Sequence, residues 1–380
     1  MTAAPLSIVH SESSCGWGGQ EIRVLEEASG MLERGHRVSL LCPRQARIFE
    51  EASRRGVPAV ALPIARKNLV GLFAMRDWLA RARCDVLNSH SSTDSWLAAL
   101  ALVGLRPRPA LVRTRHISTA IPDNLATRWL YQSATRHIVT TGERLRLQLI
   151  RDNRYRPESI DSVPTGIDLG RYAPADRAQA KVRLGLDPAQ ACIGIVATLR
   201  SWKGHRFLLE AFAALKQPDA RLLIVGDGPM REQLQQQVAQ LGLAQRVMMP
   251  GNQAEVTPWL QALDVFALPS YANEGVPQAL MQAMAAGVPV ISTPVGSIEE
   301  LVRHGETGLM VPPRDADALR AEIEHLLAEP ALGQRLAQAA LALVRKRYSR
   351  ERMLERMEAI FLRLAATPAA GGVIERGANS

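Results

Sequence analysis

Residues 264–301 read DVFALPSYANEGVPQALMQAMAAGVPVISTPVGSIEEL, and this stretch predicts the class of fold. It opens with the apolar run 265–268, bounded by proline and serine, as expected for a buried strand of a parallel sheet. Pro277 then begins a run of Ala, Leu, Met and Gln, which favour helix, and proline is common at the first helical position. Gly287 ends the helix, and 288–292 form the next strand. Strand, loop, helix and strand in this order predict an α/β fold.

Glu274 and Gly275 lie at the mouth of this predicted helix. The first amides of a helix are unpaired and partly positive, so they bind phosphate well. Gly275 lets a ligand approach the backbone, and Glu274 can accept hydrogen bonds from sugar hydroxyls. Amides for a diphosphate and an acid for hydroxyls fit a nucleotide sugar. The alternative is an ordinary turn with a solvated acid, because helix starts favour acids in any protein.

The same stretch resembles the C-terminal-domain signature of retaining GT-B glycosyltransferases of family 4. That signature has an acid, a glycine and a second acid eight positions after the first, followed by Ala-Met-Ala-x-Gly-x-Pro-Val. This chain has Glu274 and Gly275, and 283–290 reads AMAAGVPV, but Gln282 replaces the second acid. In the family that acid holds the ribose hydroxyls; glutamine can accept and donate, but not as a charged partner. The donor-binding positions implied here are Gly275, Val276, Pro277 and Gln282.

The composition is that of a globular protein with an excess of positive charge. The chain has 380 residues, enough for two domains, with 47% hydrophobic and 22% charged residues. The net charge of +9 suits an anionic partner, but only 4% of residues are aromatic, which argues against nucleic acid. The four cysteines have no metal or redox spacing. Neither a signal peptide nor an apolar run of about 18 residues is evident, so we expect a cytoplasmic protein.

The N-terminal residues predict a βαβ unit with a glycine-rich loop. A strand at 6–10 is followed by the loop SESSCGWGGQE, a helix from Glu21 and a strand at 37–41. The loop lacks the dinucleotide G-x-G-x-x-G pattern. In the family a Gly-Gly loop at this place lies in the interdomain cleft near the donor, which implies donor contacts at Gly18 and Gly19. The alternative is a flexible turn.

Further units repeat the alternation and place two histidines at strand ends. The predicted strands are 57–62, 85–90, 110–116 and 137–141, and the predicted helices are 68–83 and 96–104. Ligands of parallel sheets lie beyond the carboxyl ends of the strands, where His90 and His116 fall. A lone histidine is more often structural, but the resemblance implies that His116 contacts the donor sugar. Nearby polar residues could line the cleft: Ser118, Thr119, Thr140, Thr141 and Gly142.

The helix predicted at 68–83 and its flanks mix basic and apolar side chains. The basic residues are Arg66, Lys67, Arg76, Arg81 and Arg83, and the apolar ones are Leu69, Leu72, Phe73, Trp78 and Leu79. Further charge comes from Arg106, Arg108, Arg113 and Arg115. Such a helix can lie on an anionic membrane, as family members often do through a basic first domain. The alternative is a surface helix that packs its leucine and phenylalanine into its own domain.

The resemblance implies two Rossmann-like parallel-sheet domains that face each other across a cleft, the GT-B fold. Residues 162–174, with prolines at both ends, resemble the family's interdomain linker. We therefore expect an acceptor-side domain at 1–165 and a nucleotide-sugar-binding domain at 166–349. The helix at 350–365 is expected to return to the first domain, and 366–380 are expected to be disordered.

Two motifs of the second domain carry the remaining predicted contacts. Arg200 and Lys203 follow the strand at 192–198 and could neutralise a leaving diphosphate, as the family's Arg and Lys do, although the spacing here is shorter. The turn GDGP resembles a family motif at the next strand end. It implies donor contacts at Gly226, Asp227 and Gly228.

The resemblance implies a retaining glycosyltransferase with His116, Glu274, Arg200 and Lys203 as catalytic residues. The donor is expected to be a UDP-sugar carrying a hexosyl or N-acetylhexosaminyl group, and the resemblance implies that no catalytic metal is bound. The expected acceptor is the lipopolysaccharide core or another lipid-linked glycan at the inner face of the cytoplasmic membrane. Two alternatives stay open: a nucleotide-sugar epimerase of the same fold and a non-catalytic sugar-nucleotide binding protein.

Overall fold

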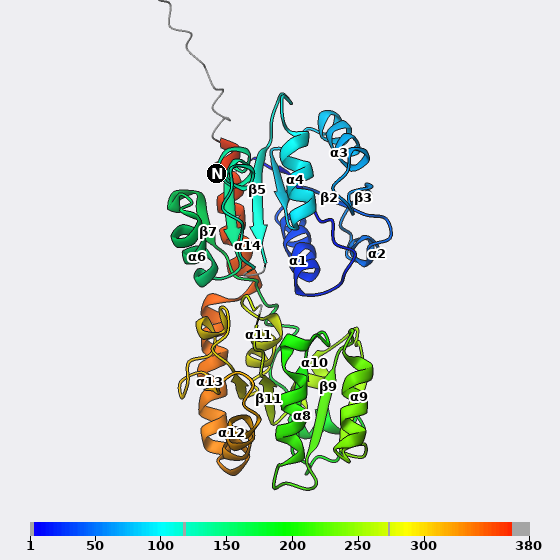
Figure 1. Ribbon diagram of the computed structural model, residues 1–380, viewed down its shortest axis with the longest axis vertical. Helices are drawn as coiled ribbons and strands as arrows, with labels where there is room; N and C mark the ends of the chain where they lie inside the picture. The colour runs from blue at the N-terminus through cyan, green and yellow to red at the C-terminus, as the bar shows by residue number, and fades with distance from the viewer. Residues whose placement is uncertain (1–3, 117–118, 273, 367–380) are drawn as a thin grey trace, which may run out of the picture.

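The computed structural model describes residues 4–116, 119–272 and 274–366. They form two domains, each with a parallel sheet between helices (Figure 1). The fold predicted from the sequence, two Rossmann-like parallel-sheet domains, is therefore confirmed. Ser118 and the tail beyond Ala366, for which hydroxyl binding and disorder were predicted, lie outside the described residues.

The N-terminal domain is built on a seven-stranded sheet in the order β3-β2-β1-β4-β5-β6-β7, with every neighbouring pair parallel. Its strands are β1 (Ser7–Ser11), β2 (Arg37–Cys42), β3 (Ala59–Ala61), β4 (Val86–Ser89), β5 (Ala110–Arg115), β6 (His137–Thr140) and β7 (Ile160–Ser162). Its helices are α1 (Gly19–Glu33), α2 (Arg47–Arg54), α3 (Leu69–Arg81), α4 (Ser92–Ala101), α5 (Leu125–Arg128), η1 (Trp129–Ala134), α6 (Glu143–Asn153) and η2 (Pro157–Ser159).

The C-terminal domain has a six-stranded parallel sheet in the order β10-β9-β8-β11-β12-β13. Its strands are β8 (Cys192–Val196), β9 (Arg221–Val225), β10 (Val247–Gly251), β11 (Val265–Leu268), β12 (Val290–Ser292) and β13 (Leu309–Met310). Its helices are α7 (Arg177–Arg183), η3 (Ser201–Lys203), α8 (His205–Ala213), α9 (Arg231–Gln240), α10 (Thr257–Gln261), α11 (Gln278–Ala285), η4 (Ile298–Glu300), α12 (Ala316–Ala328) and α13 (Pro330–Arg347).

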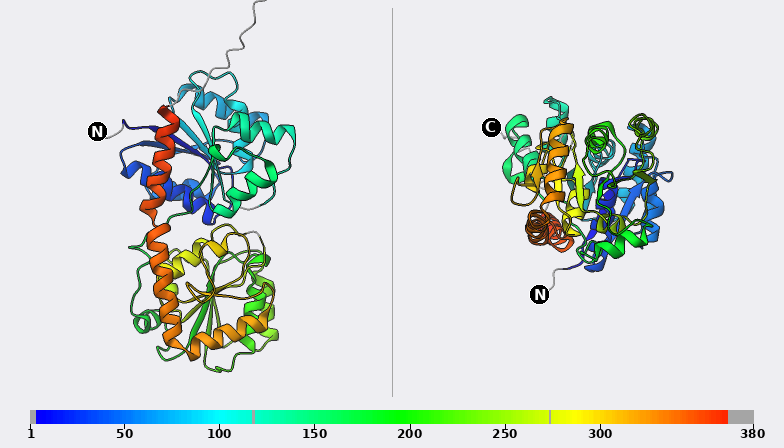
Figure 2. Two further views of the ribbon diagram at one scale, coloured as in Figure 1. Left: turned by 90° about the vertical axis from the view of Figure 1, so that its left-hand side faces the viewer. Right: turned by 90° about the horizontal axis from the view of Figure 1, so that it is seen from below.

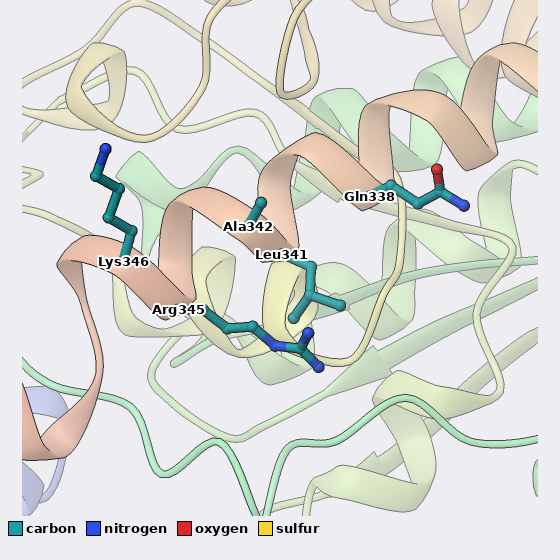
Figure 3. Close-up of a pocket in the computed structure, with 5 residues that line it drawn as sticks. All are labelled: Gln338, Leu341, Ala342, Arg345 and Lys346. Atoms are coloured by element: carbon teal, nitrogen blue, oxygen red, sulfur yellow. The ribbon is translucent and has the colours of Figure 1, made fainter.

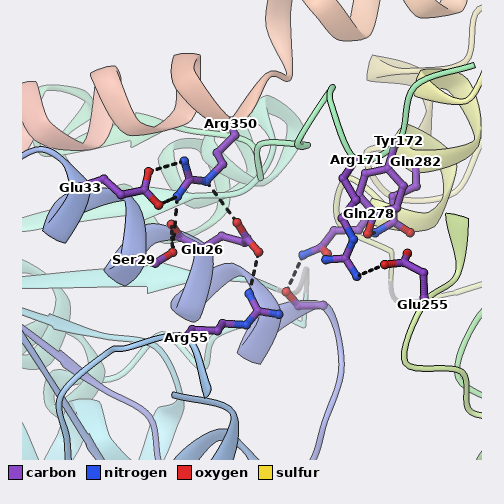
Figure 4. Close-up of polar contacts among 11 residues, drawn as sticks. Glu26, Ser29, Glu33, Arg55, Arg171, Tyr172, Glu255, Gln278, Gln282 and Arg350 are labelled. Atoms are coloured by element: carbon purple, nitrogen blue, oxygen red, sulfur yellow. Dashed lines mark hydrogen bonds and ion pairs between the residues drawn. The ribbon is translucent and has the colours of Figure 1, made fainter. Parts of the chain in front are cut away.

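The last helix, α14 (Arg350–Ala366), leaves the C-terminal domain and packs on the N-terminal one. Figure 2 shows α13 and α14 running one after the other along both domains. Met357 and Phe361 of α14 are fully buried in the N-terminal core. Arg350 binds Glu33 and Glu26 of α1, with nitrogen–oxygen distances of 2.7 and 3.2 Å (Figure 4). The C-terminal end of the described chain is thus part of the first domain.

Both sheets reverse their strand order at one point, and ligands of open α/β sheets bind beyond such a point. In the N-terminal sheet the reversal lies between β1 and β4, and in the C-terminal sheet it lies between β8 and β11. Glu12 and His90 follow the first pair of strands. Arg200 and Glu274 lie in the loops that follow the second pair. The topology therefore predicts a ligand site at the facing strand ends of the two domains.

Candidate active site

Glu274 forms a buried ion pair with Lys203 at the end of the C-terminal sheet. The residue is 4% exposed, and its Oε1 accepts hydrogen bonds from Lys203 Nζ at 2.7 Å and Ser270 Oγ at 2.6 Å. Lys203 ends η3, in the segment that follows β8, and Ser270 follows β11. The structure therefore brings together two of the predicted catalytic residues from loops that are 71 positions apart in sequence.

Two glycines that the sequence analysis did not select make this approach possible. Gly204 has φ of +76°, and a Cβ there would lie 2.0 Å from Pro269 O. Gly296 has φ of +60°, and a Cβ there would lie 1.9 Å from Glu274 O. Either side chain would push backbone away from the pair, so only glycine fits both positions. Neither glycine was assigned a role from the sequence, and the contacts that require them appear only in the folded chain.

Arg200 lies at the same strand end with its side chain exposed. Its guanidinium carbon lies 5.6 Å from the centre of the Trp202 ring, a cation–π contact that orients the side chain. An exposed guanidinium can bind two phosphate oxygens as a fork. Arg200 is thus in a position to meet an anion, whereas Lys203 already has Glu274 as a partner.

The GDGP turn after β9 packs against the chain that follows β8. Gly226 has φ of +139° and Gly228 has φ of +158°; Cβ atoms there would lie 2.0 Å from Ala197 O and 2.7 Å from Leu199 O. Asp227 Oδ1 accepts a hydrogen bond from the Gly228 amide at 2.7 Å. The close approach that these glycines permit is to the protein's own backbone, and their predicted donor contact stays a prediction.

Helix α11 begins one residue later than predicted, because Pro277 is its N-cap rather than its first helical residue. An extended backbone at Pro277, with ψ of 123°, turns the chain into the helix. Gln282 is 7% exposed, and its Nε2 donates to Tyr172 Oη at 3.0 Å (Figure 4). Tyr172 lies in the linker between the domains. The side-chain amide of Gln282, which replaces the family's acid, thus donates to a neutral phenol. The amide oxygen of Gln282 is left to accept a hydrogen bond from a ligand hydroxyl.

The two domains touch directly at the predicted donor residues. A Cβ on Gly275 would lie 2.9 Å from His116 O and 3.3 Å from Thr141 Oγ1. Gln278 Nε2 donates to Gly19 O at 2.5 Å, next to Gly18, the N-cap of α1 (Figure 4). The structure therefore brings the glycine loop and His116 of one domain against the start of α11 in the other.

A second interdomain contact lies at the N-terminus of α6. The Glu300 carboxylate accepts hydrogen bonds from the backbone amides of Glu143 at 2.9 Å and Arg144 at 3.0 Å. Gly142 precedes them, and a Cβ there would lie 2.6 Å from Ser297 Oγ. A carboxylate at a helix N-terminus is favoured by unpaired amides and the helix dipole. The amides that hold the two domains together here directly follow Gly142, one of the residues predicted to line the cleft.

His116 is the outermost of three histidines in contact, one of which the sequence analysis missed. His116 Nε2 lies 3.1 Å from His90 Nδ1, and His90 Nε2 lies 3.0 Å from His10 Nδ1. His116 is partly exposed, whereas His90 and His10 are 2% and 0% exposed. Burial lowers the pKa of His10 to about 3 and holds the pKa values of His90 and His116 well below the ordinary 6.5. All three rings are therefore neutral at pH 7. His10 and His90 are the last residues of the strands predicted at 6–10 and 85–90, and this shared position is the signal that could have revealed His10.

A buried acid also lies at this end of the N-terminal sheet. Glu12 is 0% exposed and accepts hydrogen bonds from Gln20 Nε2 at 2.5 Å and from Ser91 Oγ. Burial, and then the charge of Asp94, raise the pKa of Glu12 to about 7. Since Glu12 has no exposed surface, it supports the glycine loop rather than meeting a ligand.

The basic surface predicted around α3 is smaller than the sequence suggested. Arg113 and Arg115 are only 4% and 8% exposed, so their predicted contribution to surface charge is wrong. Both lie on the interior strand β5, where side chains on both faces are covered. Arg113 binds Ser91 O and Ser95 Oγ, and Arg115 Nη1 donates to Tyr131 Oη at 2.9 Å.

A hollow of about 610 Å³ on α13 holds none of the predicted site residues (Figure 3). Its lining residues are Gln338, Leu341, Ala342, Arg345 and Lys346. Over the residues the structure describes, histidines, cysteines and acids form no group of three or more that could hold a metal ion. In the same part of the chain, every helix is too short or too polar to span a membrane.

Comparison with known proteins identifies the family. Residues 17–171 match the Glycosyltransferase Family 4 domain, and residues 190–329 match the Glycosyl transferases group 1 domain. The D-inositol 3-phosphate glycosyltransferase of Nocardia farcinica is 32% identical over 360 residues, 80% of this chain and 76% of that protein. The lipopolysaccharide core biosynthesis mannosyltransferase LpsB of Rhizobium meliloti is 35% identical over 209 residues, 52% of this chain and 58% of that protein.

Solved structures agree with the fold. A glycosyltransferase from Rickettsia africae superposes with a TM-score of 0.86 at 19% identity, covering 95% of this chain and 99% of that one. HepE of Anabaena, crystallised with UDP and glucose, superposes with a TM-score of 0.82 at 20% identity, covering 93% and 99%. The two domain matches and the sequence relatives go further than the fold, and they show that this chain belongs to the group 1, family 4 glycosyltransferases.

Proposed function

We propose that this chain is a retaining glycosyltransferase that moves a sugar from a nucleotide-sugar donor to a glycan acceptor. The observation that carries the proposal is the contact between His116 and Gly275 across the two domains, beside the Lys203–Glu274 pair. A sugar bound at Glu274 would therefore lie between groups of both domains. This is the arrangement that transfer from a donor in one domain to an acceptor in the other requires.

In the proposed reaction, Arg200, Lys203 and the first amides of α11 stabilise the diphosphate as it departs. Preorganised donors of this kind act most strongly where charge develops in the transition state. Glu274 orients the sugar through its hydroxyls, and His116 contacts the sugar near the reacting carbon. The acceptor hydroxyl attacks on the face from which the diphosphate leaves, so that no dedicated base and no metal take part.

The proposed donor is a UDP-sugar. HepE of Anabaena, which shares the fold, has been crystallised with UDP-glucose, and this supports a uridine nucleotide here. We propose a hexosyl or N-acetylhexosaminyl group as the sugar. Gln282 faces the ribose in this proposal and accepts a ribose hydroxyl through Oε1, while Nε2 stays on Tyr172.

The proposed acceptor is the lipopolysaccharide core or another lipid-linked glycan on the cytoplasmic face of an anionic membrane. The similarity to LpsB supports the acceptor class. On α3, Leu69, Val70 and Phe73 are 68%, 66% and 62% exposed, so these side chains are available to a lipid surface. Lys67 and Arg66 are exposed beside them. Exposed apolar side chains on a helix, with basic side chains directly before it, suit the interface of an anionic bilayer.

Ligand-induced thermal stabilisation across UDP-, GDP- and ADP-sugars tests the donor. A ligand that binds only the folded state raises its apparent stability. We expect stabilisation by a UDP-sugar that is lost in Glu274→Ala and Arg200→Ala, and retained in Glu299→Ala, a control at an exposed acid. Stabilisation by none of the sugars would contradict the proposal. Binding without transfer to any acceptor would identify a non-catalytic binding protein, and donor turnover without acceptor would identify an epimerase.

Two further measurements test the finer statements. The anomeric configuration of the product, read by NMR, should equal that of the donor; inversion would contradict the retaining reaction. Sedimentation with vesicles of anionic lipid should decrease strongly in Leu69→Ser/Phe73→Ser. The control is Leu125→Ser, since Leu125 is 86% exposed on α5. Equal sedimentation of both variants and the parent protein would exclude α3 as the membrane contact.

A further inference from the structure

The innermost of the three contacting histidines, His10, lies next to a buried ion pair. His10 Nδ1 lies 4.0 Å from Glu27 Oε1, and Glu27 Oε2 lies 3.4 Å from Arg23 Nη2. All three side chains are 0% exposed. Asn88 Nδ2 also donates to Glu27 Oε1 at 3.0 Å. A continuous row of polar groups therefore connects a carboxylate on α1 to His116 at the domain interface.

Proton counting limits this row to two arrangements. Burial keeps the three rings neutral, and cations add to this effect: Arg23 near all three rings, Arg113 near His90 and His116, and Arg115 near His116. A neutral imidazole carries one N–H, and its other nitrogen accepts. Each of the two ring–ring contacts needs one proton, and His90 takes part in both. His90 therefore donates in one contact and accepts in the other, so the protons of all three rings are fixed together.

In the first arrangement the protons point outward. His10 Nδ1–H donates to His90 Nε2, and His90 Nδ1–H donates to His116 Nε2, which leaves the proton of His116 on Nδ1. In the second arrangement all donors reverse, and the proton of His10 moves to Nε2. His10 Nε2 is buried and has no hydrogen-bond partner among the described residues.

Two independent features favour the first arrangement. The second would bury an N–H of His10 without an acceptor, and orphaned N–H groups are rarer in native proteins than unsatisfied acceptors. The Glu27 carboxylate lies on the Nδ1 side of His10, where it favours a proton on Nδ1. Burial raises the pKa of Glu27, while Arg23 and the hydrogen bond from Asn88 favour its ionised form. Arg23 is protonated at every physiological pH and is fully buried beside it, so the ion pair holds the charge on Glu27.

We propose that Glu27, His10 and His90 are positioning residues that fix the tautomer of His116, so that His116 presents an N–H rather than a bare nitrogen on the side away from His90. The inference deepens the proposed function, since it assigns the chemistry by which His116 meets the sugar. With Nδ1 protonated, His116 donates a hydrogen bond to an oxygen of the donor sugar. It does not act as a base in this state, which agrees with a reaction that needs none.

NMR of the full chain labelled with ¹⁵N in its histidine rings tests the proposal without any substrate. Two-bond ¹H–¹⁵N correlations distinguish the two tautomers of each ring, and the signals of His116 are assigned by their loss in His116→Gln. We expect His116 to carry its proton on Nδ1 and couplings between ¹⁵N nuclei across both ring–ring hydrogen bonds. A proton on Nε2 of His116, or a charged ring at pH 7, would overturn the inference.

A charge variant tests the part assigned to Glu27. In Glu27→Gln we expect a measurable population of the Nε2–H tautomer of His116, because the carboxylate no longer favours one direction. The matched control is Glu26→Gln on the same helix, whose acid binds Arg55 and Arg350 and no histidine. Unchanged tautomers in Glu27→Gln would remove Glu27 from the proposal. These NMR measurements need no sugar transfer. The inference can therefore fail while the proposed function holds, and the proposed function can fail while the inference holds.

Discussion

Lys203 Nζ lies 2.7 Å from Glu274 Oε1, with side-chain exposures of 20% and 5%. The cation proposed to meet the diphosphate and the acid proposed to hold the sugar are thus a single buried ion pair. A bound diphosphate would have to share Lys203 with Glu274 or replace Glu274 as its partner. In the proposed site, this pair would couple binding of the diphosphate at Lys203 to the freedom of Glu274 to bind the sugar.

Replacing one member of this pair should destabilise the fold. Lys203→Met leaves the Glu274 charge buried, and breaking a buried pair costs roughly 3–5 kcal/mol, with the lower end expected because Lys203 keeps some contact with water. The double variant Lys203→Met/Glu274→Gln should recover most of the free energy of unfolding but no transferase activity. Urea unfolding measures the free energy of unfolding of the single and the double variant, and an assay of sugar transfer measures their activity. A single variant as stable as the parent would contradict the burial of the pair.

Gln282→Glu should strengthen donor binding. Tyr172 Oη accepts from Gln282 Nε2 at 3.0 Å, but a phenol can also donate, so a carboxylate keeps this contact. A charged acceptor for the ribose hydroxyls is stronger than an amide. We expect the Kd for the donor to fall by up to about tenfold, which equals roughly 1.4 kcal/mol. Calorimetry measures it, with Tyr172→Phe as the control for the lost phenol. Weaker binding by Gln282→Glu would show that the amide serves another contact.

Glu300→Ala should shift the protein toward a more open arrangement of its domains. Its carboxylate binds two amides at the start of α6, an interaction of about 1 kcal/mol, or about fivefold in the closed population. Small-angle X-ray scattering should show a larger radius of gyration, and KM for the donor should rise. In the control, Glu299→Ala removes an acid of the same helix that binds the exposed Arg144 side chain. Equal behaviour of both variants would exclude Glu300 as the closing contact.

The buried histidines should make the protein sensitive to acid. The pKa of His10 is about 3, and those of His90 and His116 are well below 6.5. These histidines take up protons below pH 6.5 in the unfolded chain, whereas in the folded chain His10 does so only near pH 3 and His90 and His116 only well below pH 6.5. The stabilisation is therefore complete above pH 6.5 and is lost as the pH falls, at about 1.4 kcal/mol per histidine and pH unit until the folded-state pKa of that histidine is reached.

The histidine contribution can be separated from that of other groups. Glu12, with a pKa of about 7, acts in the opposite direction, because its stabilisation is complete below pH 4.5 and is lost as the pH rises through 7. Comparing the parent with His10→Phe cancels the Glu12 term. The loss of unfolding free energy between pH 7 and pH 5 should be smaller in His10→Phe by about 1–2 kcal/mol. An equal loss in both proteins would contradict a neutral, buried His10.

Local sequence was sufficient to predict the fold class and most strands of the sheets. The strand β11 has the predicted bounds, because a short apolar run between turn residues leaves little choice of conformation. Elements with a weak sequence pattern were not predicted. No signal in the sequence analysis marked the edge strand β7, and α2 is a two-turn helix with few apolar residues.

The candidate site could be predicted only where a motif is continuous in sequence. Glu274, Gly275 and Gln282 belong to one strand–loop–helix unit, so their proximity follows from local geometry. Arg113 and Arg115 were misplaced on the surface, because alternation along a strand does not reveal whether both faces of the sheet are covered. His10 was not predicted, because its role depends on contact with His90, which is 80 positions away in sequence.

What the sequence by itself determined was the set of strand–helix units and the chemistry of each strand end. Hydrophobic periodicity and turn residues act over a few positions, and these positions are adjacent in the chain. Only the tertiary structure decided which ends meet: Lys203 with Glu274, Gly275 with His116, and His116 with His90 and His10. These contacts depend on strand order and on domain closure, since residues far apart in sequence become partners only when both sheets are packed and facing each other.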